Sequence, residues 1–149
     1  MNLEEKINTE IKTAMLAKDS KRLEALRAIK AEILLLKSSE KGSSEDAENK
    51  AMMKMVKQRK ETAEIYASQN RPELQETELF QASVIESFLP KQMNTDELQV
   101  AVKEIMATVG ASSMADMGKV MGVATKQLAG KAEGKAISEM VKKLLSGAA

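Results

Sequence analysis

The sequence contains neither cysteine nor histidine, and these two absences remove several kinds of chemistry from this chain of 149 residues. Without a thiol or an imidazole, no cysteine nucleophile, Ser-His-Asp triad, histidine base or zinc site with cysteine or histidine ligands can form. No disulfide can form either, which suits a reducing compartment, so we expect a cytoplasmic protein. We expect no catalytic residue, no metal and no cofactor, and a function that depends on binding.

Aromatic residues are also scarce, at 2% of the chain, and there is no tryptophan. The core must therefore consist of aliphatic side chains and of the 11 methionines. Helices pack well with such unbranched or small side chains, whereas sheets favour aromatic and β-branched residues. The charged N-terminus resembles neither a signal peptide nor a membrane anchor, and no apolar run approaches a spanning length, so we expect no membrane contact.

Apolar spacing predicts an all-helical fold with four helices, a proline-marked junction and three further helices. The expected helices cover about residues 3–18, 20–37, 45–69, 72–89, 95–109, 113–128 and 136–145, with a polar loop near 38–44. Pro90 marks the junction, so we divide the chain into an N-terminal subdomain, 1–91, and a C-terminal subdomain, 92–149. Leu34 and Leu35 widen the apolar stripe of the second helix, which predicts burial on more than one side.

Several turn and cap signals support these limits. Asp19 or Ser20 can cap the second helix, and Asn94 with Glu97 has the spacing of a capping box. Asn70 tolerates the left-handed exit that precedes Pro72. Met15, Leu74 and Leu79 fall on the apolar faces of their helices, so we expect them to point inward.

The net charge is only +1, and two groups of basic residues are candidate binding surfaces. The first lies on the second and third helices and contains Lys21, Arg22, Arg27, Lys30, Lys54, Lys57, Arg59 and Lys60. Interleaved glutamates could neutralise this group as a solvated, salt-bridged face, or the group could bind phosphate. From Lys119 onward, six lysines meet only Glu133 and Glu139, which makes the C-terminal tail mildly positive.

Two glycine-containing segments stand beside C-terminal lysines. Gly118 and Gly122 are four residues apart in a predicted helix around Lys119, which indicates either close approach of another helix or access for a ligand. Gly130 and Gly134 bracket a predicted turn that carries Lys131 and Lys135. Because free N–H groups at a helix start attract anions, this turn could contact phosphate, although an interhelical turn needs only its glycines.

In this order, the segments resemble the YqeY-like family of small bacterial proteins, and they are similar to the tail domain of the B subunit of the tRNA-dependent amidotransferase (GatB). The matching residues are Ala17-Lys18-Asp19, Arg22-Leu23-Glu24-Ala25-Leu26-Arg27, Lys57-Gln58-Arg59-Lys60, Tyr66, Arg71-Pro72-Glu73-Leu74, Glu78, Phe88-Leu89-Pro90-Lys91-Gln92, Asp116-Met117-Gly118-Lys119-Val120-Met121-Gly122 and Gly130-Lys131-Ala132-Glu133-Gly134-Lys135. Phe88 stands where the family commonly has tyrosine, Asn70 where it has glycine, and Glu133 where aspartate is frequent.

The resemblance implies a multihelical protein of two subdomains, cytoplasmic, with tRNA or a tRNA-dependent enzyme as its partner. The favoured function is a non-catalytic tRNA-binding or amidotransferase-related accessory module. Its candidate contacts are Lys119, Lys131, Lys135, Arg22, Arg27, Lys57 and Arg59, and its candidate structural residues are Gly118, Gly122, Gly130, Gly134 and Pro90. An adaptor that binds proteins through apolar helix faces is the alternative. An amidase acting on a carbon–nitrogen bond, as the family label suggests (a ligase with glutamine as amido-N-donor), is a third.

Overall fold

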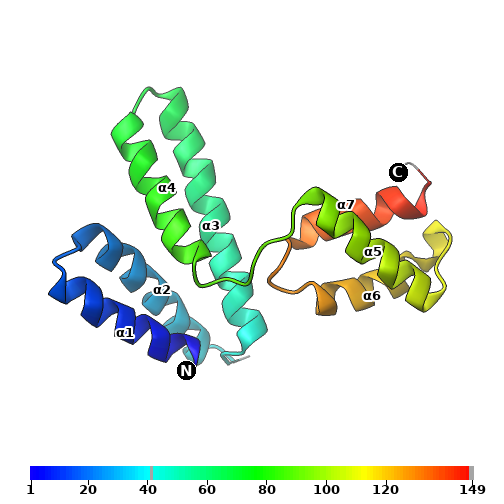
Figure 1. Cartoon of the computed structure of the whole chain (residues 1–149), viewed down its shortest axis with the longest axis horizontal. Coiled ribbons are helices and arrows are strands. Elements are labelled where there is room, and N and C mark those ends of the chain that lie inside the picture. The colour runs from blue at the N-terminus through cyan, green and yellow to red at the C-terminus, as the bar shows by residue number, and fades with distance from the viewer. Residues whose placement is uncertain (41, 148–149) are drawn as a thin grey trace. The chain divides into compact units, whose positions relative to one another are not determined.

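The structure is a computed structural model that describes residues 1–40 and 42–147 (Figure 1). In that part of the chain there are seven α-helices, one short 3-10 helix and no strand, which confirms the predicted all-helical fold. Lys41, in the predicted loop, lies outside the described residues. By its internal contacts the chain divides into Met1–Pro90 and Lys91–Ala149. The division into two subdomains that fold separately, with their boundary after residue 91, stays a prediction.

The N-terminal unit consists of two helical hairpins. Its helices are α1 (Leu3–Leu16), α2 (Ser20–Ser38), α3 (Glu45–Ser68) and α4 (Pro72–Glu86). Helices α1 and α2 form one antiparallel hairpin, and α3 and α4 form the other (Figure 1). Helix α2 packs on both helices of the second hairpin, whereas the backbone of α1 approaches only that of α2 among the described helices. Helix α2 therefore joins the two hairpins.

Polar caps set where these helices begin and end. The Asp19 carboxylate accepts a hydrogen bond from the Arg22 N–H at 3.1 Å, as predicted, and caps α2. Asn70 has a φ of 58°, and Pro72 follows as the first residue of α4. Sequence reasoning missed a capping box at the start of α1, where Asn2 and Glu5 bond reciprocally.

The core of the N-terminal unit is aliphatic, with methionines from α3. Its fully buried large side chains are Ile7, Leu26, Ile29, Ile33 and Ile85. The prediction that Leu34 and Leu35 bury a second side of α2 was wrong, because these side chains are 49% and 64% exposed. Met15, Leu74 and Leu79 are also exposed, contrary to expectation. Each helix of this unit buries one stripe of side chains, and these five apolar residues lie outside the buried stripes.

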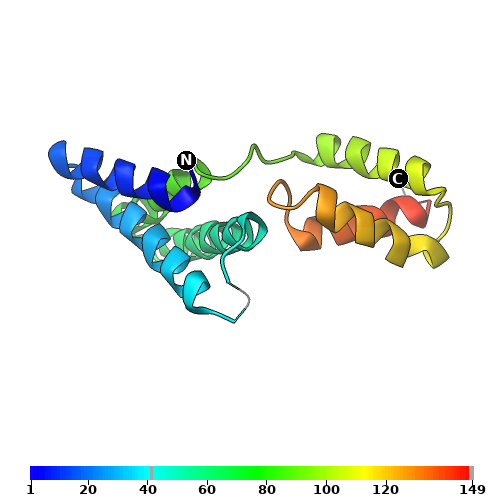
Figure 2. The same ribbon diagram turned by 90° about the horizontal axis from the view of Figure 1, so that it is seen from below.

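The C-terminal unit is a three-helix bundle preceded by a tethered segment. It contains α5 (Thr95–Val109), the 3-10 helix η1 (Met114–Asp116), α6 (Met117–Gln127) and α7 (Gly134–Leu145). The three α-helices pack on one another (Figures 1 and 2) around Val102, Val120 and Val141. Before α5, the Met93 N–H donates to the Lys131 carbonyl oxygen at 2.9 Å. This bond fixes the start of the unit against the turn between α6 and α7.

The predicted caps of α5 are confirmed. Asn94 and Glu97 form the expected capping box, and Gly110 ends the helix with a φ of 70°. No helix in residues 1–40 and 42–147 is both long and apolar enough to cross a membrane.

Candidate nucleic-acid interface

The basic cluster of the N-terminal unit is partly used in packing. Arg22 donates to the Glu10 carboxylate at 3.0 Å, and this ion pair joins α2 to α1. Arg59 donates from Nε to the side-chain oxygen of Gln81 at 3.0 Å and so links α3 to α4. Both arginine side chains are half-buried. Their guanidinium groups already have partners within the fold, which makes them poorer candidates for a phosphate contact than the sequence suggested.

Arg27 on α2 and Lys57 on α3 differ from these arginines because their side chains are exposed. Neither forms a hydrogen bond or an ion pair with another described residue. The ion pairs that form in this cluster connect different helices, as Lys60 does with Glu86 at 2.7 Å. The expected pairs between neighbouring turns of one helix are absent from the described part.

Helix α6 opens with a well-defined turn beside Lys119. The Asp116 carboxylate accepts hydrogen bonds from the N–H groups of Ser112 at 3.0 Å and Ser113 at 3.3 Å. These two bonds hold the pKa of Asp116 below its ordinary value of 3.8; burial opposes them, and the charge of Lys119 lowers the pKa by less than either bond. The start of α6 is therefore fixed by a carboxylate that stays ionised, with the exposed Lys119 side chain in the first turn.

Gly118 and Gly122 lie inside α6 and not in a turn. Both are exposed, and a β-carbon placed on either of them would meet no atom within 4 Å. Close approach of another helix of the C-terminal unit, which one of the two predicted explanations would allow, therefore does not occur. The packing of the unit would accept a larger side chain at both positions. What remains is a strip of helix surface on which the backbone is open to an approaching molecule.

The turn between α6 and α7 carries the other two candidate lysines. Gly130 is buried and has a φ of 77°, so the chain reverses at a residue without a side chain. Lys131 follows directly and is exposed. Gly134 is the first residue of α7, which places the exposed Lys135 in its first turn, and Glu133 gives that turn no side-chain cap. The positive charges of Lys131 and Lys135 thus lie near backbone N–H groups at the start of α7 that no side chain caps.

The candidate lysines occupy opposite ends of α6. Lys119 is in its first turn, whereas Lys131 and Lys135 follow its last residue. The 11 residues of α6 span roughly 16 Å at 1.5 Å per residue. One phosphate group cannot bridge that distance. The arrangement suits an extended polyanion that carries several phosphates.

Sequence reasoning counted Lys142 and Lys143 in the positive tail but did not name them as candidate contacts; they lie in the last turn of α7. Helix α7 contacts η1, and its C-terminal end lies at the η1 end of the unit (Figures 1 and 2). These lysines therefore add charge at the Lys119 end, where both are exposed. The signal was present as two successive lysines opposite the apolar positions Ile137, Met140 and Val141.

In the described ranges, no three Asp or Glu side chains lie close enough together to hold a metal ion. No curated protein sequence matches this chain. A family model of the YqeY-like proteins matches residues 4–145, nearly the whole length. The resemblance to the YqeY-like family is thereby confirmed, and the chain belongs to that family.

Proposed function

We propose that this protein is a non-catalytic accessory module that binds tRNA through the lysines of its C-terminal unit. The observation that carries the proposal is the surface of α6, where Gly118 and Gly122 leave the backbone open between lysine-bearing ends. Each glycine inside a helix costs about 1 kcal/mol relative to alanine. Because no packing within the unit requires them, a partner that approaches the helix closely is a physical reason for both.

The contacts would go to phosphates and sugars and not to bases. Residues 91–149 contain no phenylalanine, tyrosine or tryptophan, so this unit has no aromatic ring on which an unpaired base could stack. Lysines bind phosphate as point charges and fix orientation without reading sequence. The module would thus hold the shape of a folded RNA, and a partner enzyme would supply sequence recognition and chemistry.

The similarity of the motifs to the amidotransferase tail domain supports tRNA as the RNA and a tRNA-dependent enzyme as the partner. In that enzyme the tail domain helps to hold tRNA while other domains carry out the reaction. A cytoplasmic location follows from the same proposal. No observation favours the amidase alternative, because the described Ser and Thr hydroxyls that donate hydrogen bonds donate them to backbone carbonyl oxygens.

A protein-interaction adaptor is the second candidate, and one observation favours it. Leu34 and Leu35 are adjacent, exposed and apolar on α2. Exposed leucines next to each other indicate a surface that a partner protein could cover. A partner that stays bound after nuclease treatment and in high salt would favour this adaptor function.

The deciding experiment measures binding of total tRNA by the purified protein at several salt concentrations. The test variant carries Lys119→Ala, Lys131→Ala and Lys135→Ala, and the matched control carries Lys12→Ala, Lys50→Ala and Lys103→Ala, three exposed lysines outside both basic groups. Each lost phosphate contact should reduce the slope of log affinity against log salt by about 1, so the test variant loses about 2 to 3. Equal loss in the two variants, or no binding at low salt, contradicts the proposal.

A further inference from the structure

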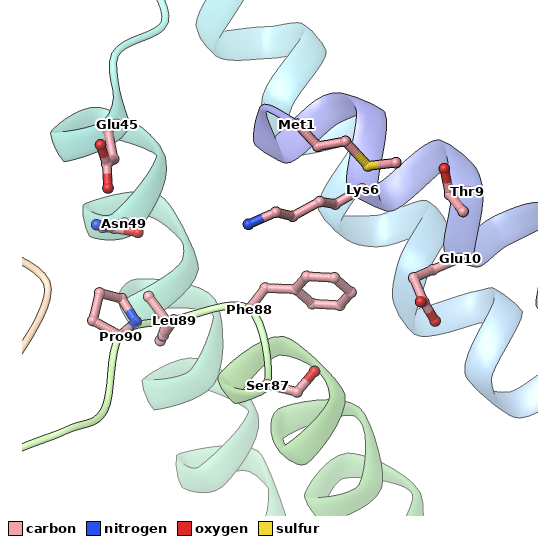
Figure 3. Close-up of a pocket in the computed structure, with 10 residues that line it drawn as sticks. All are labelled: Met1, Lys6, Thr9, Glu10, Glu45, Asn49, Ser87, Phe88, Leu89 and Pro90. Atoms are coloured by element: carbon pink, nitrogen blue, oxygen red, sulfur yellow. The ribbon is translucent and has the colours of Figure 1, made fainter.

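A groove in the N-terminal unit is a second candidate site, separate from the lysines of the C-terminal unit. It lies between α1, the first turns of α3 and the segment that follows α4 (Figure 3). The groove has a volume of about 640 Å³. A second hollow of about 380 Å³ shares five of its lining residues, among them Lys6, Asn49 and Phe88. Hollows of this size hold small organic molecules or short peptides.

Asn49 is the feature of the groove that points to a ligand. The residue is 8% exposed, and no other polar residue is buried in the described part of the chain. It lines both hollows, and none of the described residues forms a hydrogen bond with its amide, which opens onto the groove. Leucine or methionine at this inward position of α3 would add apolar burial, whereas an amide that faces the groove without a protein partner adds little to the stability of the fold. A ligand group that both donates and accepts hydrogen bonds would satisfy it.

Charges of opposite sign occupy the two walls of the groove. Lys6 extends from α1 toward α3, where Glu45 and Asn49 lie on successive turns (Figure 3). Glu48 lines the adjoining hollow on the α3 side. None of these three charged side chains forms an ion pair with a described residue, whereas Glu10, also in the groove, is paired with Arg22. The ligand that matches these walls carries both a positive and a negative charge.

The remaining lining is apolar or already bonded. Phe88 and Leu89, both half-buried, come from the segment after α4, and the Phe88 ring lies between Asn49 and α1 (Figure 3). The hydroxyls of Thr9 and Ser87 donate to carbonyl oxygens of their own helical turns. Hydrogen bonding to a ligand therefore falls mainly to Asn49, and Phe88 offers a surface for an apolar side chain.

We infer that this groove binds a short peptide with free termini. Its ammonium group would face Glu45 and Glu48, its carboxylate would face Lys6, and a main-chain amide would pair with the Asn49 amide. A peptide group fits Asn49 because each has one N–H donor side and one carbonyl acceptor side. A phosphate or an RNA strand is disfavoured, because the two glutamates would repel it.

The test is a titration of the full-length ¹⁵N-labelled protein with the unprotected tripeptide Ala-Leu-Ala, followed by NMR. The side-chain NH₂ signals of Asn49, assigned with the Asn49→Ala variant, report directly on the contact. The expected result is a saturable shift of these signals. Acetyl-Ala-Leu-Ala-amide lacks both charges, so its affinity should be lower than that of the free tripeptide by a factor of about ten or more. Absence of a saturable shift at about 10 mM tripeptide would overturn the inference.

Variants and competing probes complete the test. Glu45→Gln with Glu48→Gln should weaken tripeptide binding severalfold, whereas Glu61→Gln, an exposed change on α3 outside the groove, should leave it unchanged. Glu45 is exposed and Glu48 is half-buried, and neither forms an ion pair with a described residue, so this comparison remains decisive if Asn49→Ala unfolds the unit. Equal affinity for the blocked peptide, or an equal shift with inorganic phosphate, would overturn the charge assignment. Equal affinity for free leucine would overturn the peptide assignment.

Discussion

Arg22 on α2 donates a hydrogen bond from its Nη2 to the carboxylate of Glu10 on α1 at 3.0 Å. The backbone of α1 approaches only that of α2 among the described helices, so this ion pair lies at the one interface that holds α1 in place through its main chain. The side chains are 34% and 38% exposed, so water screens the pair. Its role is therefore to orient α1, at a modest gain in stability.

From this pair we predict a small effect on stability and none on RNA binding. A double-mutant cycle with Arg22→Ala and Glu10→Ala should give a coupling energy of roughly 0.5 kcal/mol, reduced by added salt. Urea unfolding measures it. The tRNA affinity of Arg22→Ala should match that of the parent protein. An Arg22→Ala variant that keeps its stability but loses affinity for tRNA would show that Arg22 contacts the RNA after all.

Gly122→Ala should stabilise the C-terminal unit and weaken tRNA binding. Alanine in a helix interior is favoured over glycine by about 1 kcal/mol, and open space around Gly122 leaves no clash to oppose this gain. Gly118→Ala, in the first turn of α6, should act in the same direction with a smaller gain. Urea unfolding and tRNA binding are measured on the same samples. Stabilisation with unchanged tRNA affinity would show that the open face of α6 is not used.

Gly130→Ala should have the opposite effect on stability. With a φ of 77°, Gly130 holds a conformation that costs an alanine about 1–2 kcal/mol. Gly134→Ala is the matched control, because Gly134 begins α7 and a β-carbon there would meet no atom within 4 Å. Thermal unfolding should therefore rank Gly130→Ala below the parent and Gly134→Ala at or above it. A melting temperature of Gly130→Ala equal to or above that of the parent would contradict this explanation of the turn.

The helices could be predicted from sequence because their signals are local. Asp19, Asn70 and Asn94 act within three or four residues of themselves, and apolar spacing reveals one buried stripe for each helix. Burial around that stripe depends on neighbouring helices, which a single helix pattern does not reveal. For this reason Leu34 and Leu35 were assigned to the core, although they are exposed.

The candidate sites show the same division between local and distant information. The glycines and lysines of α6 were visible as a motif, but only the fold shows that Gly118 and Gly122 face open space. Arg59 looked like part of a basic surface until Gln81, 22 residues away, proved to be its partner. Asn49 gave no sequence signal, because one asparagine in a polar helix start is ordinary. Only the fold shows that Asn49 is buried beside a groove that residues of α1 and of the segment after α4 also line.

Asp116 makes the start of α6 sensitive to acid. Hydrogen bonds from the Ser112 and Ser113 N–H groups, more than the nearby Lys119, lower the pKa of this carboxyl in the folded protein below its ordinary value of 3.8. A depressed folded pKa means that the ionised carboxyl stabilises the fold above pH 3.8, and that this stabilisation is lost as pH falls through the lower folded pKa. Asp116→Asn should therefore unfold at a lower temperature than the parent near neutral pH. Below the folded pKa the two melting temperatures should converge.

Asp96→Asn, an exposed change in the first turn of α5, controls for the loss of one negative charge. A difference between parent and Asp116→Asn that stays constant down to the lowest pH would show that the carboxylate does not act through its ionised form.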